Sequence, residues 1–163
     1  FMGGREYEVI RAGRSVVPTT ADEAAVLAAG LMLWPSVVAD GGPFPGRKMR
    51  WSEDLGGFGE GVREVALSFY LALMTAECLV LTGAAGPVIV EGPFATNAAY
   101  CRMLAAASGR QVLRAASQTG TSIGAALLFG RAESAPPLVA TMQAGDTALY
   151  QNYAAAWREA IGG

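Results

Sequence analysis

The sequence contains no histidine. This excludes Ser-His-Asp and Cys-His catalysis as well as HExxH metal sites, because each of them needs an imidazole. Cysteine is scarce too: Cys78 and Cys101 are the only two, and neither belongs to a CxxC or Cys/His pattern. Both lie in helix-like stretches, so we expect two buried thiols that behave as small hydrophobes, rather than a zinc site or a disulfide framework.

Clustered positive charge is also missing. The 12 Lys and Arg residues are outnumbered by 14 Asp and Glu residues, which gives a formal net charge of −2. A nucleic-acid binder or a protein of the membrane surface needs a basic patch, so we expect neither nucleic acid nor membrane as a partner. The 52% of hydrophobic residues suffices for one well-filled core. One globular domain with small-molecule or protein partners is expected.

No apolar run reaches the roughly 20 residues that a bilayer span requires. The longest, from Val65 to Leu81, is interrupted by Glu77 and two hydroxyl residues, and it predicts a buried helix. No basic segment with an apolar stretch and a cleavage site opens the chain, so the expected location is the cytoplasm. Because the chain starts at Phe1, we expect further sequence upstream.

Helical and extended patterns alternate along the chain, which favours an α/β fold with a parallel or mixed sheet flanked by helices. Glycines at 13, 30 and 109 follow periodic stretches and predict helix ends, and Thr20 is the expected N-cap of the second helix. The expected helices are 4–12 (short and exposed), 20–29, 62–81, 96–107, 122–129 and 148–161, and the expected strands are 31–38, 87–90, 111–115 and 138–142.

Two strand-to-helix junctions are candidate anion sites. At the first, an apolar strand ends at Val90, the chain turns at Gly92, and a helix begins near Asn97. Backbone N–H groups and the positive helix end suit a nucleotide there, and glycine permits close approach; the alternative is a turn that binds nothing. The second junction, 120–126, is rich in small residues that packing also explains, and it lacks the Gly-Lys-Ser/Thr ending of a Walker A motif.

Two weaker candidates lie earlier in the chain. Gly3 and Gly4 open the first helix, where a phosphate could approach the backbone; a solvated helix without a ligand is the alternative. Asp40 begins a loop of glycines and prolines that ends at Gly46. It could lie near a ligand or metal, although an aspartate in such a loop more often caps its own turn.

The order of these segments resembles the C-terminal half of the FGGY carbohydrate kinases, the family of glycerol kinase and xylulokinase. The best segment is 88–130, where a strand, an acidic-Gly turn, an Asn-led helix, a glycine stop, a second strand and a small-residue helix succeed one another as in that family. Gly4 with Glu8 resembles the family's Gly-x-x-x-Gln helix start. The glycine-proline loop and the final aromatic helix are similar to family features as well.

This resemblance implies an actin-like, ribonuclease H-related ATPase fold, in which residues 1–163 form the C-terminal nucleotide-binding domain. It implies ATP and Mg²⁺ as ligands, with Gly92 and Asn97 at the adenosine and Gly4 and Glu8 beside the phosphates. The intact protein is then expected to phosphorylate a sugar or polyol hydroxyl. The sugar site and the catalytic aspartate would come from an N-terminal domain outside this chain, so this part alone is expected to be inactive. A homodimer is left open.

Two departures from the family pattern support a rival hypothesis. Pro93 replaces the second glycine of the turn and so removes a backbone N–H donor. Glu8 occupies the position where the family has an amide side chain. Its negative charge would repel phosphate oxygens unless a metal or Arg5 intervenes. The rival is a non-catalytic actin-like module used for assembly or regulation. A Rossmann-like dinucleotide binder ranks last, because no GxGxxG with an acidic residue about 20 positions later follows a predicted strand.

Overall fold

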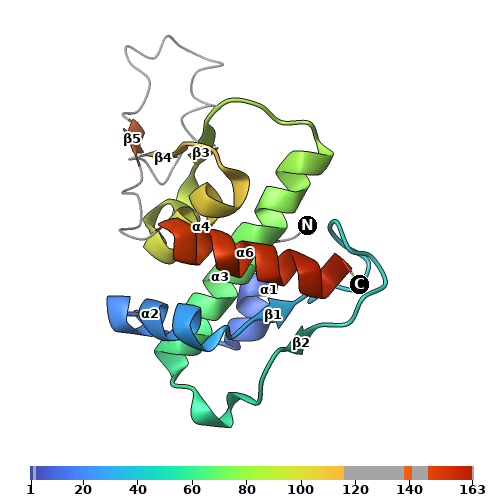
Figure 1. The fold of residues 1–163 in the computed structure, drawn as a ribbon, viewed down its shortest axis with the longest axis vertical. Coiled ribbons are helices and arrows are strands. Elements are labelled where there is room, and N and C mark those ends of the chain that lie inside the picture. Colours follow the sequence, from blue (N-terminus) through green and yellow to red (C-terminus); the bar gives the residue numbers. More distant parts are fainter. Residues whose placement is uncertain (2, 116–137, 141–146, 163) are drawn as a thin grey trace.

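The computed structural model describes residues 1, 3–115, 138–140 and 147–162. A small sheet lies at one end of the molecule, and helices surround one long helix in the rest (Figure 1). The helices are α1 (Gly3–Arg11), α2 (Thr20–Ala29), α3 (Glu60–Leu81), α4 (Ala98–Ser108) and α6 (Thr147–Gly162), with 3₁₀ turns η1 (Leu55–Gly57) and η2 (Gly92–Thr96), and the strands are β1 (Leu33–Trp34), β2 (Arg50–Trp51), β3 (Val88–Val90), β4 (Val112–Ala115) and β5 (Leu138–Ala140).

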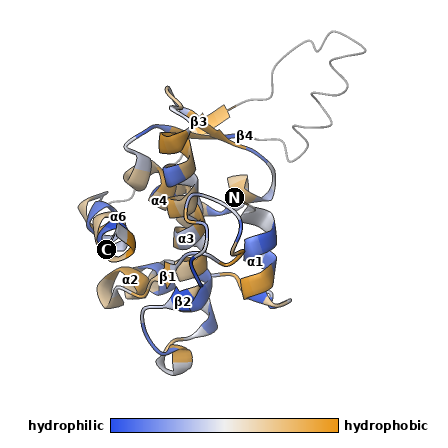
Figure 2. Cartoon of the chain, turned by 90° about the vertical axis from the view of Figure 1, so that its right-hand side faces the viewer, coloured by the Kyte–Doolittle hydropathy of each residue, from blue (hydrophilic) through white to orange (hydrophobic). Residues whose placement is uncertain are grey.

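Helix α3 forms the centre of the hydrophobic core. In Figure 2 it runs between α2 and α6 on one side and α1 on the other. Because neighbours cover it, 13 of its 22 residues are buried. By length and composition α3 could also cross a membrane, yet 67% of the relevant 18-residue window is buried inside the protein. A helix that is apolar nearly all round and covered in this way is typical of the core of a folded domain.

The sheet is mixed, which is one of the two alternatives that the sequence leaves open. Strand β3 pairs with β4 in parallel, and β4 pairs with β5 antiparallel. Helix α4 forms the connection between the two parallel strands, which is the usual way to join such a pair. Val88 and Val90 turn into the core while Ile89 is 51% exposed, so the sheet is buried on one face at β3. Strands β1 and β2 form a two-stranded antiparallel ladder of their own.

The predicted strand 31–38 is wrong in its extent. Only Leu33–Trp34 is a strand, and the chain bends away after it. Pro35 lacks the N–H that would continue the ladder. The hydroxyl of Ser36 instead donates to the carbonyl oxygen of Phe44 at 2.7 Å, which ties the glycine-proline loop back on itself.

The bounds predicted for the second helix, 20–29, are confirmed, but its N-cap differs from the predicted one, and α4 begins two residues later than predicted. The N-cap of α2 is Thr19, not Thr20: the Thr19 hydroxyl accepts from the Asp22 N–H, and the Asp22 carboxylate accepts from the Thr19 N–H at 2.8 Å. Helix α4 begins at Ala98 rather than at 96, because Asn97 is extended and caps it. The predicted stops at positions 30 and 109 are confirmed, since both glycines have φ of 65°.

Of three further predictions, one is wrong, one is confirmed in part, and one lies outside the described residues. The first helix is not wholly exposed, since Glu6 is 0% exposed. Cys101 is buried as expected, but Cys78 near the end of α3 is only half-buried, and this burial raises the pKa of its thiol. The predicted helix 122–129 and the junction 120–126 lie outside the described residues.

The aromatic face predicted for the last helix is confirmed. Tyr150 and Tyr153 of α6 both meet the ring of Phe69 edge-on, with centroids 5.7 and 5.2 Å away. One turn further, Trp157 is 0% exposed and its Nε1 donates to the carbonyl oxygen of Leu33 at 2.8 Å. Helix α6 is therefore bound to both α3 and β1.

Trp157→Phe tests this attachment. The change keeps an aromatic ring but leaves the buried carbonyl of Leu33 without its donor, so the free energy of unfolding should fall by about 2 kcal/mol. The matched control is Gln151→Ala on the exposed side of α6, where a change within about 0.5 kcal/mol is expected. Urea denaturation followed by circular dichroism measures both, and equal losses would contradict the assignment.

Candidate nucleotide-binding cavity

A cavity of about 690 Å³ lies between α1, the start of α2, α3 and the η2–α4 junction. It brings together three of the four residues singled out from the sequence, Gly4, Glu8 and Asn97, and Gly92 lies next to its lining residue Pro93. Asp40 is not among its lining residues. The full lining is Gly4, Tyr7, Glu8, Arg11, Val16, Val17, Pro18, Thr19, Thr20, Glu23, Glu64, Val65, Pro93, Phe94, Thr96, Asn97, Ala98, Ala99 and Arg102.

One wall of the cavity is a single face of α1. Gly4, Tyr7, Glu8 and Arg11 are spaced three and four residues apart, which places them on one side of a helix. Gly4 and Glu8 are exposed to the cavity, and a Cβ at Gly4 would meet no atom within 4 Å. The guanidinium of Arg11 lies over the Tyr7 ring, 5.3 Å from its centroid. The backbone at the start of α1 is thus accessible from the cavity.

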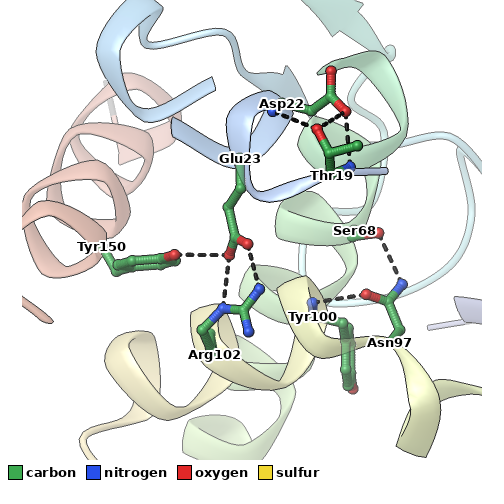
Figure 3. A network of polar contacts seen from close by, with 8 residues as sticks. All are labelled: Thr19, Asp22, Glu23, Ser68, Asn97, Tyr100, Arg102 and Tyr150. Carbon is green, nitrogen blue, oxygen red and sulfur yellow. Dashed lines mark hydrogen bonds and ion pairs between the residues drawn. The ribbon is translucent and has the colours of Figure 1, made fainter. Parts of the chain in front are cut away.

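The opposite wall is the η2–α4 junction, where Asn97 has a structural role. Its Oδ1 accepts from the Tyr100 N–H at 3.0 Å and caps α4, and its Nδ2 donates to the hydroxyl of Ser68 at 2.9 Å. Figure 3 shows this side chain held between α4 and α3. The amide therefore fixes the junction against the central helix, and sequence reasoning that assigned it to adenosine missed this use.

Gly92 and Pro93 shape the turn into η2. Gly92 has φ of 69°, a left-handed conformation that glycine adopts without strain. Pro93 follows in the first turn of the 3₁₀ helix, where a backbone N–H has no partner within the helix to lose. The proline is consequently compatible with the local fold, although it does not restore the donor of a Gly-Gly turn.

An ion pair between Glu23 and Arg102 forms part of the cavity lining. The carboxylate of Glu23, on α2, accepts from Nε of Arg102 at 2.9 Å and also from Nη2 of the same guanidinium. The hydroxyl of Tyr150, on α6, donates to the same carboxylate at 2.7 Å. Hydrogen bonding to Glu23 raises the pKa of Arg102, and burial together with Glu23 raises the pKa of Tyr150 to about 12. The arginine stays charged and the tyrosine stays a donor.

Two more carboxylates lie buried between α1 and α3. Glu64 is 7% exposed, lines the cavity and accepts from the Tyr7 hydroxyl. Glu6 does not line the cavity. Its Oε2 accepts from the Tyr70 hydroxyl at 2.6 Å, and its Oε1 has no hydrogen-bond partner among the residues that the structure describes. Burial first, and then Glu6, raises the pKa of Tyr70. Each tyrosine is thus a proton donor to a carboxylate at this interface.

Sequence reasoning missed Tyr7, Glu23, Glu64 and Arg102. The available signal was a charged residue at a helix position that the apolar pattern places inside, as with Glu64 in α3. Buried charges require partners, so such a position indicates an ion pair or a hydrogen-bonded carboxylate.

A family model for the C-terminal domain of FGGY carbohydrate kinases matches residues 1–137. The chain belongs to this family. The crystal structure of a carbohydrate kinase from Novosphingobium aromaticivorans is similar to it, with a TM-score of 0.77 and 28% sequence identity. The match covers 99% of this chain and 36% of that one, so the FGGY domain described here spans about a third of its structural relative. No curated protein matches the sequence.

The cavity of this FGGY domain is mixed in charge. Its lining includes two arginines, Arg11 and Arg102, and three glutamates, of which only Glu8 is exposed. Within the described part of the chain, no group of three or more Asp, Glu, Cys or His side chains could hold a metal ion. A Mg²⁺ ion normally takes one or two carboxylates and completes its shell with water and phosphate oxygens, so this lining can serve it only in combination with a nucleotide.

Alkaline pH tests the Tyr7–Glu64 contact. Burial first, then the hydrogen bond to Glu64, raises the pKa of Tyr7 to about 12, whereas an unfolded tyrosine ionises near pH 10. Stability from this contact is fully present below pH 10 and is lost as the pH rises from 10 to 12. Because Tyr7 is only half-buried, we expect a loss of at most about 1 kcal/mol.

Urea unfolding between pH 9 and pH 12 measures this loss. The curve of Tyr7→Phe should fall less steeply than that of the wild type, because phenylalanine has no proton to lose. The other tyrosines contribute equally to both curves. Parallel curves would show that the contact does not shift the pKa.

Proposed function

We propose that this domain holds ATP in the α1–α4 cavity, and that the intact protein transfers the γ-phosphate to a sugar or polyol hydroxyl. The observation that carries the proposal is that Gly4, Glu8 and Asn97, taken from distant parts of the sequence, line one cavity beside the Gly92 turn. FGGY membership supplies the reaction class. The fold in this proposal is the actin-like, ribonuclease H-related ATPase fold, with residues 1–163 as its nucleotide-binding part.

The phosphates are assigned to the α1 side of the cavity. The start of a helix presents backbone N–H groups and a partial positive charge, and the absence of a side chain at Gly4 leaves room for a phosphate to approach them. Glu8 follows one turn later and is negatively charged. Mg²⁺ bound with the nucleotide would neutralise the phosphate oxygens, and Glu8 is the exposed lining carboxylate that would hold it.

The nucleoside is assigned to the α4 side. Phe94 and Ala98 offer apolar contacts there, and the Asn97 cap fixes the junction in place. The proton of the sugar hydroxyl must pass to a base, and we assign that base to an aspartate of an N-terminal domain outside this chain. The length of the structural relative, of which this chain spans 36%, leaves room for such a domain. The expected setting is the cytoplasm.

Gly4→Ala tests the phosphate assignment. Alanine favours the helix, so stability should be unchanged or higher by about 0.5 kcal/mol. Its methyl group would nevertheless obstruct the phosphates, and the Kd for ATP with Mg²⁺ should rise about tenfold. Adenosine is the internal control, because it lacks phosphates and its Kd should not change. Isothermal titration of the intact protein measures both, and an unchanged Kd for ATP would place the phosphates elsewhere.

Turnover separates the kinase from its non-catalytic rival. We expect the intact protein to release ADP from ATP and Mg²⁺ in the presence of one member of a panel of ketoses, aldoses and polyols. ADP release coupled to NADH oxidation measures this, with the same reaction lacking any acceptor as the control. ATP binding without release for any acceptor would favour the actin-like module used for assembly or regulation.

A further inference from the structure

Three helices meet at the carboxylate of Glu23. Figure 3 shows it between Arg102 of α4 and Tyr150 of α6, while Glu23 itself belongs to α2. Glu23 is 5% exposed, and the side chain of Arg102 is 22% exposed. A buried pair of this kind is held in one geometry, because any movement would leave a charge without its partner.

Arg102 lines the cavity, and only part of its guanidinium is engaged by Glu23. The pair with Glu23 uses Nε and Nη2, which leaves Nη1 outside it, and Arg102 is one of the lining residues. Two parallel bonds to one carboxylate also fix the plane of the group. A guanidinium fixed in this way can donate to a ligand acceptor, or lie against a planar ring, without losing rotamer freedom on binding.

Because the charge of Arg102 is compensated by Glu23, Arg102 is better suited to an uncharged part of the ligand than to a phosphate. Glu23 compensates the positive charge at close range, so the net attraction for a triphosphate is weak. A directional donor remains, and it suits uncharged acceptors such as a ring nitrogen, a carbonyl oxygen or a ribose hydroxyl. Arg102 also belongs to α4, the side of the cavity assigned above to the nucleoside.

Tyr150 controls this arrangement from outside the cavity. It is not a lining residue, and its helix α6 lies beyond the residues 1–137 that the family model matches. Its hydroxyl donates to Oε1 of Glu23, the same oxygen that accepts from Nε of Arg102. The hydroxyl of Tyr150 also interacts directly with the Arg102 guanidinium. Without this hydroxyl the carboxylate can rotate, and the plane of the guanidinium would rotate with it.

We propose that Arg102 binds the nucleoside part of the ligand and that Tyr150 is a positioning residue, which acts on Arg102 through Glu23 and through its own contact with the guanidinium. The inference rests on the proposed nucleotide site and assigns to it a specificity element contributed by the C-terminal helix.

The chain offers a closely matched control for Tyr150. Tyr153 lies on the same face of α6, meets the same Phe69 ring and donates its hydroxyl at 2.6 Å, but to the backbone carbonyl of Leu31. Tyr150→Phe and Tyr153→Phe therefore remove the same group from similar surroundings. In the intact protein, the first should raise the Kd for ATP and for adenosine by the same factor, about tenfold, and the second should leave both within about twofold.

A double-mutant cycle with Arg102→Lys tests the route. Lysine keeps the charge but loses the planar, two-bond geometry, so Arg102→Lys alone should raise both Kd values about tenfold or more. If Tyr150 acts through Arg102, adding Tyr150→Phe to Arg102→Lys should cause no further loss. Thermal melting of each variant fixes a titration temperature at which all are folded.

The outcomes separate this inference from the proposed function. If the wild type binds neither ATP nor adenosine, the nucleotide site itself is wrong. If the wild type binds but the two tyrosine variants behave alike, or Tyr150→Phe weakens binding equally with and without Arg102→Lys, the positioning role is overturned. Losses confined to ATP would place Arg102 at the phosphates and overturn its nucleoside assignment.

Discussion

The burial of α3 is the constraint on which the rest of the domain depends. A helix of 22 residues that is apolar nearly all round has to be covered over most of its length. Helices α1, α2 and α4 pack against it, and α6 packs its aromatic rings against Phe69. Of these elements, α1, α2 and α4 also contribute walls of the cavity. The position of the cavity is therefore a by-product of core packing.

Where the walls of the cavity need polar groups, the domain provides them in pairs. Glu64 is matched by Tyr7, Glu23 by Arg102 and Tyr150, and Asn97 by Ser68. A half-satisfied buried network would cost several kcal/mol. The pairs also join helices that are distant in sequence, so the same contacts that satisfy buried charge hold the lining in register.

Much of the fold could be predicted from the sequence because its signals are local. Glycine stops, hydrophobic runs and the aromatic spacing of α6 each depend on a few neighbouring residues, and they gave the helices and the β3–α4–β4 unit. The apolar pattern predicts a strand over 31–38 that is too long. Pro35 and the hydrogen bond between Ser36 and Phe44 end the strand after Trp34. The prediction that Gly4, Glu8 and Asn97 serve one site rests on the family resemblance, and not on local signals. The partners of Glu23 and Glu64 could not be predicted at all, since each pair joins residues more than 50 positions apart.

The capping box of α2 makes the helix starts around the cavity unequal. Three helices begin at its rim, and the starts of two of them are already occupied by oxygen atoms of the protein: those of Thr19 and Asp22 at α2, and that of Asn97 at α4. The Asp22 carboxylate is ionised there, because hydrogen bonds from Thr19 lower its pKa. An anionic group would be repelled by this carboxylate at α2, and at α4 Asn97 already accepts from the Tyr100 N–H. For the proposed nucleotide, the caps of α2 and α4 therefore disfavour phosphates at those two helix starts, whereas Gly4 leaves the start of α1 open to the cavity.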